Sequence, residues 1–287
     1  MDRAIEEYNH PYGFEGYRTS RGALRHAALS LTAAYWQGVG KVDYWLRKER
    51  IQFLYMHHLF PPDEAGFRHL LESLRATHQF LGYSEAVQRL EQDRIDRPYV
   101  CLSFDDGLRQ NINAAMILQE YDIPACFFVC PGLVGERDSV KLKEICATRF
   151  RMPPTELLSW AEVEALVAAG FEIGSHTMTH QVLAQLSSTQ LTDEIGQSYE
   201  VLKKRLGEVQ HFAWPEGRYF HFSDAAARAV YEAGYQSCAS AERGCHTTQL
   251  LHLDETPILR RDYLPAHWPY EHVLYFLTRN SQRAAGH

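Results

Sequence analysis

The sequence lacks an apolar run long enough to cross a membrane. A transmembrane helix needs roughly 18 or more consecutive apolar residues, and the nearest candidate, residues 23–40, is interrupted by Arg25, His26 and Gln37. Residues 1–7 are polar and acidic, so they do not form the apolar centre of a secretory signal. We therefore expect a cytoplasmic protein.

The chain also lacks an excess of positive charge and a paired-cysteine motif. It carries 29 Lys and Arg against 36 Asp and Glu, a formal charge of −7. No basic stripe is available to displace counterions, so we expect no nucleic-acid partner. The six cysteines form no Cys-x-x-Cys pair, and several lie in apolar runs typical of small buried side chains. These features fit a reduced, cytosolic protein.

Strand and helix patterns alternate from residue 51 onward. Strands are predicted at 51–56, 99–104, 125–129, 171–174 and 211–214, with short ones near 237 and 258. Helices are predicted at 66–76, 84–92, 110–121, 159–169, 189–206 and 223–233. Repeated strand–helix units predict a parallel sheet, here an α/β barrel-like domain over residues 51–287, with functional residues just past the strand ends. Residues 134–157 form a long, partly basic insertion of the kind that shapes access to a site.

Residues 1–50 are predicted to be a separate N-terminal part, an arm followed by a helical extension. Helical spacing puts five side chains on one face: Leu24, Ala28, Leu31, Ala34 and Tyr35. Gly38 and Gly40 are expected to break the helix. We expect the apolar face to pack on the rest of the chain. Peripheral membrane association through residues 21–50 is the alternative, because aromatic residues lie near cations there: Trp36, Tyr44 and Trp45 near Lys41, Arg47, Lys48 and Arg50.

Two short motifs carry the chemistry. The predicted strand at 99–104 ends in Asp105, Asp106 and Gly107, and the strand at 171–174 is followed by His176 and His180. One carboxylate and two imidazoles form a facial set of three ligands that leaves positions open on a divalent metal. The other carboxylate is then free for proton transfer. This combination is typical of a metal-assisted hydrolase.

The order FDDG, SHTMTH, FAWPEG resembles the polysaccharide deacetylase superfamily, carbohydrate esterase family 4. The resemblance extends over roughly residues 52–265 and includes the strand at 123–129 and Leu158-Ser159-Trp160 before a helix. It implies a distorted (β/α) barrel with one divalent metal bound by three ligands, Asp106, His176 and His180. It also implies that Asp105 is the general base. Zinc suits this ligand set best, and cobalt, nickel or iron would also fit.

The third motif departs from the family pattern, because residues 213–217 read Ala-Trp-Pro-Glu-Gly where typical members have Arg-x-Pro-Tyr-Gly. By resemblance, the backbone N–H of Glu216 donates to the oxyanion of the reaction intermediate. The Glu216 side chain either binds a substrate amine or hydroxyl, or points to solvent. Arg218 either replaces the missing arginine in part or screens Glu216.

The general acid is the least defined residue. Residues 55–59, Tyr-Met-His-His-Leu, resemble the strand end that carries the acid in a permuted branch with exopolysaccharide deacetylases, which favours His57. His58 and His267 are the alternatives. By the same resemblance, a late strand near residues 254–261 orients the base and acid, and Arg261 is the candidate there.

These expectations predict a cytoplasmic, metal-dependent N-deacetylase acting on an N-acetylated saccharide. The absence of an export signal favours a nucleotide-linked, lipid-linked or oligosaccharide substrate in lipopolysaccharide or other surface-glycan biosynthesis, with the inner membrane face as a site of action. Hydrolysis of a different amide, such as a formamide or a cyclic amide, is one alternative. A non-catalytic glycan-binding homologue is another. The sequence leaves the oligomeric state open.

Overall fold

The computed structural model describes residues 20–247, 251–253, 256–266 and 268–286. The strands of this part of the chain are β1 (Arg50–Met56), β2 (Gln79–Leu81), β3 (Pro98–Phe104), β4 (Ala125–Val129), β5 (Glu172–Ser175), β6 (His211–Ala213), β7 (Ser237–Ala239), β8 (Leu251–Leu253), β9 (Thr256–Ile258) and β10 (Arg261–Tyr263). The strands expected between residues 51 and 258 are confirmed, most of them to within a residue or two.

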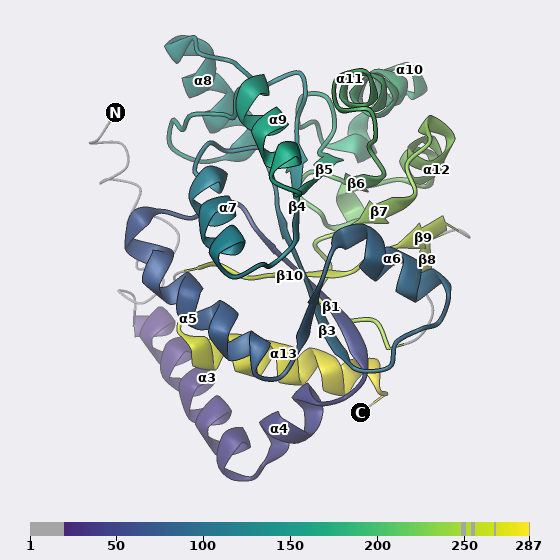
Figure 1. The fold of residues 1–287 in the computed structure, drawn as a ribbon. Helices are drawn as coiled ribbons and strands as arrows, with labels where there is room; N and C mark the ends of the chain where they lie inside the picture. The colour runs from purple at the N-terminus through teal and green to yellow at the C-terminus, as the bar shows by residue number, and fades with distance from the viewer. Residues whose placement is uncertain (1–19, 248–250, 254–255, 267, 287) are drawn as a thin grey trace.

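Eight of the described strands form a parallel, nearly closed barrel, and β8 and β9 form a separate antiparallel pair. The order in the barrel is β10-β1-β3-β4-β5-β6-β7, and β2 pairs with the first half of β3. The segment before β10 reaches back to the other edge, where Leu259 pairs with Ala239 of β7. Residues 259–263 therefore touch both edge strands, β7 and β1, and the predicted distorted (β/α) barrel is confirmed (Figure 1).

Helices surround this sheet. They are α3 (Ser20–Gly38), α4 (Lys41–Leu46), α5 (Glu64–Arg75), α6 (Tyr83–Glu91), α7 (Asn111–Glu120), α8 (Ser139–Ile145), α9 (Trp160–Ala168), α10 (Ser188–Leu191), α11 (Gln197–Leu206), α12 (Asp224–Ala233) and α13 (Tyr270–Ala284). The helix expected at 189–206 is interrupted by a π-helical turn, Thr192–Gly196. The insertion at 134–157 contains α8 and a second π-helical turn, Cys146–Phe150. The pattern analysis missed β2, α8 and α13.

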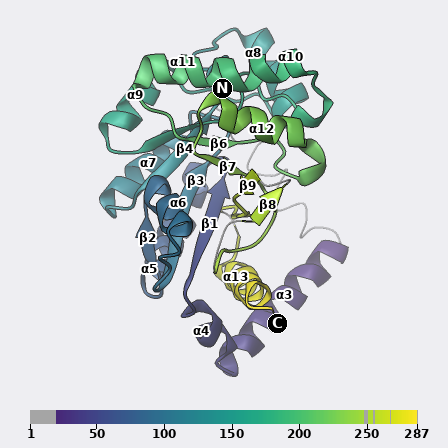
Figure 2. The same cartoon turned by 90° about the vertical axis from the view of Figure 1, so that its right-hand side faces the viewer.

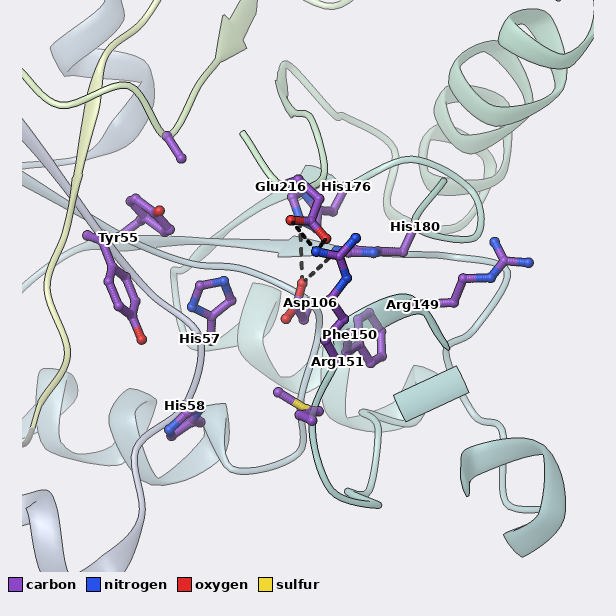
Figure 3. A pocket seen from close by; sticks show the side chains of 13 residues that line it. Tyr55, His57, His58, Asp106, Arg149, Phe150, Arg151, His176, His180 and Glu216 are labelled. Carbon is purple, nitrogen blue, oxygen red and sulfur yellow. Dashed lines mark hydrogen bonds and ion pairs between the residues drawn. The ribbon is translucent and has the colours of Figure 1, made fainter. Parts of the chain in front are cut away.

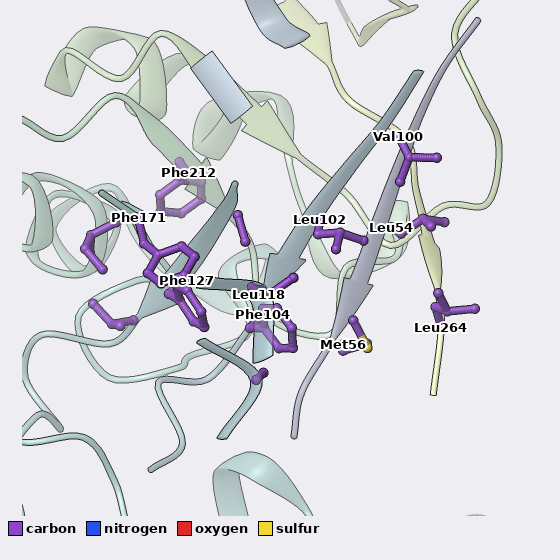
Figure 4. Close-up of a cluster of buried hydrophobic side chains, with 14 of the residues drawn as sticks. Leu54, Met56, Val100, Leu102, Phe104, Leu118, Phe127, Phe171, Phe212 and Leu264 are labelled. Atoms are coloured by element: carbon purple, nitrogen blue, oxygen red, sulfur yellow. The ribbon is translucent and has the colours of Figure 1, made fainter. Parts of the chain in front are cut away.

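Alternation along the strands separates two cores. Side chains that point outward fill the layer between sheet and helices, among them Leu54, Leu102 and Phe127 (Figure 4). Side chains that point inward fill the barrel, among them Phe53 and Phe128. This period of two is what a pleated strand imposes. It also decides which polar residues near the strand ends face the barrel interior.

The helical extension packs against the C-terminal helix. One face of α3 lies on α13, where the Trp36 and Tyr275 rings stack at 5.0 Å between centroids. Just after α4, the buried guanidinium of Arg50 donates to the carbonyls of Trp45, Leu46 and Lys48. One face of the extension therefore packs on the rest of the chain, but the predicted face was wrong. The five predicted side chains are exposed, whereas Ala33 is buried and Trp36 stacks on α13, because α3 carries apolar residues on both of its faces. The rest of the arm, residues 1–19, lies outside the described residues.

None of the described helices is long and apolar enough to cross a membrane. All six cysteines are buried and free. Burial raises the pKa of thiols such as Cys101 and Cys126. They are packing residues rather than reactive ones, as the apolar runs around them indicate.

Candidate metal centre and the pocket around it

The end of β3 turns two adjacent carboxylates in different directions. Asp105 continues the inward-facing row of the strand, but Asp106 has a φ of 72° and Gly107 a φ of 66°. A left-handed conformation at a non-glycine residue is costly and is found mainly at functional sites. A side chain at Gly107 would also crowd Val129, whose Cβ would lie 3.3 Å from the added carbon. The turn therefore separates the roles of the two aspartates.

Asp105 is held by a bidentate ion pair inside the barrel. Nη1 and Nη2 of Arg261 each lie 2.8 Å from one carboxylate oxygen of Asp105. Both side chains are at most 3% exposed. Arg261 also donates from Nε to the carbonyl of Ser240 at 2.9 Å. Burial would lower the pKa of Arg261, but Asp105 raises it above its ordinary value, so this arginine stays charged.

Asp106, His176 and His180 form a buried cluster. Nε2 of His176 and Nε2 of His180 lie 3.4 and 3.2 Å from Oδ1 of Asp106, and the three candidate ligand atoms all lie within 4.8 Å of one another. Although both rings are near, the buried Oδ1 atom of Asp106 has no hydrogen-bond partner of good geometry. Such an orphaned buried oxygen beside two imidazoles fits a divalent metal, since a cation would satisfy all three atoms.

The ring of His176 is oriented by the backbone. Its Nδ1 lies 2.7 Å from the carbonyl of Ala213 at the end of β6, so Nδ1 carries the proton and Nε2 presents a lone pair to the cluster. Burial by itself would raise the pKa of Asp106, but the two histidines hold it well below its usual range. Burial would lower the pKa of His176, but Asp106 raises it. The cluster therefore keeps Asp106 ionised and ready to bind a cation.

A carboxylate that the sequence analysis missed holds the histidine loop. Glu194, in the π-helical turn, accepts from the backbone N–H and the hydroxyl of Thr179 at 2.8 and 2.6 Å. The Glu194 carbonyl also accepts from the N–H of Met178 at 2.8 Å. Thr177 and His180 in this loop have φ values of 66° and 62°. The three bonds stabilise a conformation that the loop would otherwise disfavour.

An open pocket of about 340 Å³ lies over the cluster. Figure 3 shows the side chains that line it: Tyr55, His57, His58, Asp106, Arg149, Phe150, Arg151, Met152, His176, His180, Glu216, Ala241 and Tyr263. The insertion contributes residues 149–152, so it does shape access to the site, as expected. Phe150 meets the ring of His180 edge-on at 4.8 Å, and Arg149 donates to the carbonyl of Thr179 at 3.0 Å.

The third motif contributes Glu216 to the wall of the pocket. Glu216 has a φ of 62° and Gly217 a φ of 64°, and a Cβ at Gly217 would collide with Ala241. The Glu216 carboxylate is paired with Arg151 of the insertion at 3.3 Å. Arg218 lies elsewhere, 3.4 Å from Glu242. The arginine beside Asp105 is therefore Arg261, and the cation beside Glu216 is Arg151.

Two of the three candidate general acids lie at this pocket. His57 packs between the Tyr55 and Tyr263 rings, with centroids 5.6 and 5.3 Å away. His58 also lines the pocket, and its ring lies 4.6 Å from that of Phe60. His267 lies outside the described residues. The choice of His57 stays a prediction.

Of the residues that line the pocket or support its loops, Glu194 and Arg149 had the weakest sequence signals. Neither belongs to a motif, and each acts through a loop residue distant in sequence. Tyr55 and Tyr263 could have been found, since each occupies an inward position of a strand next to a candidate residue. The parallel pairing of β1 with β10 brings these two tyrosines opposite each other.

Taken together, the fold and the cluster define a (β/α)-barrel protein with a candidate divalent-metal site at the carboxyl ends of its strands. The chain belongs to the polysaccharide deacetylase family, whose model matches residues 92–238, just over half of its length. The family is described as that of the polysaccharide deacetylases. The recognition from the three motifs is thus confirmed.

Solved structures of deacetylases share the fold. The deacetylase PplD of Streptococcus pyogenes, solved with acetate, is 21% identical, with a TM-score of 0.63 over 79% of this chain and 98% of its own. IcaB of Ammonifex degensii is 18% identical, with a TM-score of 0.64 over 81% and 98%. A de-N-acetylase of Aggregatibacter actinomycetemcomitans is 16% identical, with a TM-score of 0.58 over 79% and 100%. At these identities the likeness establishes the fold. No curated protein sequence matches the chain.

Proposed function

We propose that this protein is a metal-dependent hydrolase that removes an N-acetyl group from an N-acetylated sugar. The observation that carries the proposal is the pairing of two units at one pocket. One is the buried cluster of Asp106, His176 and His180, and the other is Asp105, fixed by Arg261. The membership in the polysaccharide deacetylase family supports the same chemistry.

Asp106, His176 and His180 would hold the metal, and zinc is our proposal for a set of two imidazoles and one carboxylate, with cobalt, nickel or iron as alternatives. When bound, such an ion polarises the amide carbonyl and lowers the pKa of water. The Nδ1–H of His176, bonded to the Ala213 carbonyl, keeps the ligand nitrogen pointed at the site.

The remaining steps belong to the protein's own residues. Asp105 accepts a proton from the water that attacks the acetamide carbon, and the two hydrogen bonds from Arg261 hold this carboxylate in position. The backbone N–H of Glu216 donates to the oxygen that becomes negative. His57 then gives a proton to the sugar nitrogen as the C–N bond breaks, and the products are acetate and an amino sugar. PplD, which shares the fold, was solved with acetate.

We infer that the substrate is a nucleotide-linked, lipid-linked or short saccharide of surface-glycan biosynthesis, such as that of lipopolysaccharide, and that the enzyme acts in the cytoplasm at the inner face of the membrane. Arg149 and Arg151 support a phosphate-bearing substrate, because both cations lie on the pocket wall. The open pocket accepts a sugar that continues into a larger carrier.

The decisive experiment is calorimetric titration of Zn²⁺ into the chelator-stripped protein, followed by an acetate-release screen. One tight site is expected in the wild type, absent in His176→Ala and kept in His69→Ala, whose ring lies outside the pocket against Tyr270. Asp105→Asn should keep the metal and lose about 10²–10⁴-fold in kcat.

Three results would contradict the proposal. Absence of a metal site would remove the mechanism. Formate released instead of acetate would point to a different amide. Metal and glycan binding without turnover, unchanged in Asp105→Asn, would indicate a non-catalytic homologue.

A further inference from the structure

Exposed large hydrophobic side chains gather on the hairpin formed by α3 and α4. Of the nine such side chains that stand out in the described residues, five lie here: Leu24, Leu31, Tyr35, Val39 and Tyr44, each 57–72% exposed. The other four are scattered over α7, α8, α9 and a 3₁₀ turn. Scattered apolar side chains are normal on a protein surface, but a contiguous group marks an interaction site.

The helical spacing explains why this row is exposed. Leu24, Leu31 and Tyr35 are separated by seven and four positions, so they lie along one face of α3. The opposite face carries Ala33, which is fully buried, and Trp36, stacked on Tyr275 of α13. Figures 1 and 2 both show α3 at the periphery, outside α13 and away from the barrel. Within the part of the chain that the structure describes, one face of α3 is thus packed and the other is exposed.

The charges around the row have one dominant sign. Helix α3, Ser20–Gly38, contains no acidic residue, whereas the whole chain has a net charge of −7. At the α4 end, the Lys41 ammonium lies 4.0 Å from the centroid of Trp36, and that of Lys48 lies 4.3 Å from the centroid of Tyr44. Basic residues beside exposed apolar and aromatic side chains are typical of interfacial helices on anionic membranes.

A hollow of about 570 Å³ adjoins the same end of the hairpin. Its wall includes Tyr44 and Trp45, and the two cations Arg47 and Lys48 there outnumber the one acid, Glu49. Basic residues in a concave site at the membrane surface bind the phosphate of lipid headgroups. The hollow lies beside the apolar row, so a headgroup and acyl chains could be contacted together.

We propose that the α3–α4 hairpin docks on a phospholipid surface rich in anionic headgroups. The apolar row enters the boundary between headgroups and acyl chains, and Lys41, Arg47 and Lys48 meet the phosphates. A second copy of the chain fits this face less well, because pairing two such hairpins sets an excess of cations against cations. Helix α3 has no acid, and Asp43 and Glu49 are outnumbered by Lys41, Arg47 and Lys48. This docking is independent of the deacetylase chemistry, and it would bring a lipid-linked substrate to the pocket.

The test is co-sedimentation of the full-length protein with phosphatidylcholine vesicles, with and without phosphatidylglycerol. Wild type should bind the phosphatidylglycerol vesicles more tightly, and salt should weaken this binding. Leu31→Glu should lower the affinity for the phosphatidylglycerol vesicles by about tenfold or more. The matched control is Val140→Glu. Val140 is 73% exposed, but it belongs to α8 and not to the α3–α4 hairpin. This variant should bind the vesicles as wild type does.

A second variant separates charge from apolar contact. Combined Arg47→Gln and Lys48→Gln should weaken binding to phosphatidylglycerol vesicles several-fold while leaving binding to neutral vesicles unchanged. The proposal would be overturned if wild type bound neither kind of vesicle. It would also be overturned if Leu31→Glu bound the phosphatidylglycerol vesicles as tightly as wild type does. If wild type formed a dimer that Leu31→Glu dissociates, and bound no vesicles, the exposed face of α3 would instead be an interface with a second copy of the chain. Equal melting temperatures of all variants check that each is folded.

Discussion

Two buried polar clusters lie on either side of β10. The inner cluster, around Asp105 and Asp106, lies next to a pocket, whereas the outer cluster, around Asp262, lies between the sheet and α13. Successive residues of β10 point to opposite faces. Arg261 enters the barrel and binds Asp105, whereas Asp262 points outward, where it accepts from the Asn280 amide at 2.7 Å and from Gln52. One strand therefore serves the pocket with one side and the helical layer with the other.

The inner cluster is incomplete without a ligand. Oδ1 of Asp106 is buried and lacks a hydrogen-bond partner, and left-handed backbone occurs at Asp106, Thr177 and His180. A pocket opens onto these atoms. Unsatisfied atoms and strained backbone together are expected where a protein prepares a site for something it must bind.

The outer cluster is surrounded by protein groups. Asp262 lies among Gln52, Asn280 and, at 3.6 Å, Arg243. It lines neither of the two pockets described above. Its role is to join α13 to β1 and β10. Oε1 of Gln52 and Nη1 of Arg243 also lack a hydrogen-bond partner, so neither a buried charge nor an unpaired buried atom by itself marks a functional site. The inner cluster differs because its unpaired atom lies among three candidate metal ligands that line a pocket.

The largest expected effect comes from breaking the inner ion pair. Arg261→Met leaves Asp105 as an uncompensated buried charge, so the free energy of unfolding should fall by about 3–5 kcal/mol. Denaturant titration measures this loss. The double variant Asp105→Asn with Arg261→Met should recover much of the stability but no activity. If the single variant is as stable as the double one, the pair does not bear on stability.

The outer cluster should make the free energy of unfolding depend on pH. Burial raises the pKa of Asp262 to about 6, in spite of Arg243 and Asn280, which lower it. The folded state therefore holds a proton that the unfolded state has lost between about pH 4 and pH 6, and stability falls as the pH rises through this window. Asp262→Asn removes this titration.

Relative to wild type, the stability of Asp262→Asn should therefore increase by about 2–3 kcal/mol from pH 4 to pH 7. Urea titrations at a series of pH values give the difference directly. A difference that is flat across the window would show that Asp262 is not perturbed.

The hydrogen bonds by which Glu194 holds the histidine loop should affect the affinity for a metal ion. Glu194→Gln replaces one of the two oxygens that accept from Thr179 with an amide that donates. We expect Zn²⁺ affinity to fall about 10–100-fold, as for other groups that orient metal ligands. Glu200→Gln, an exposed position of α11, is the control. Calorimetry that finds both variants equal to wild type would leave Glu194 without a role at the site.

The smallest effect is expected at the pocket rim. Glu216→Gln removes an ion pair with Arg151, whose side chain is 66% exposed, so stability should change by less than about 1 kcal/mol. If Glu216 binds a substrate amine or hydroxyl, KM should rise several-fold with kcat nearly unchanged. Arg218→Gln, which loses a contact with Glu242, should alter neither constant. A fall in kcat alone would give Glu216 a role in the chemical step.

Much of the fold and of the metal centre could be predicted from the sequence. Period-two strands alternate with helical segments, and parallel strands bring their carboxyl ends to one edge. Asp106, His176 and His180 each follow such an end, so their convergence required only the order of the strands. The departure at Glu216 was also visible in the sequence, although its partner was not.

Other features depended on contacts between distant segments. The family resemblance made Arg261 the candidate for orienting the base, but its contact with Asp105 depends on closure of the barrel by residues 259–263. Glu194 reaches Thr179, and Arg151 reaches Glu216, across loops of irregular shape.

The sequence by itself determined the alternation of elements and the positions of the candidate metal ligands, because both follow from local periodicity and from strand ends. The tertiary structure decided which charges meet, which loop is braced and which face of α3 is left exposed. These depend on how the sheet closes and where α13 packs, and both are set by the packing of the whole chain.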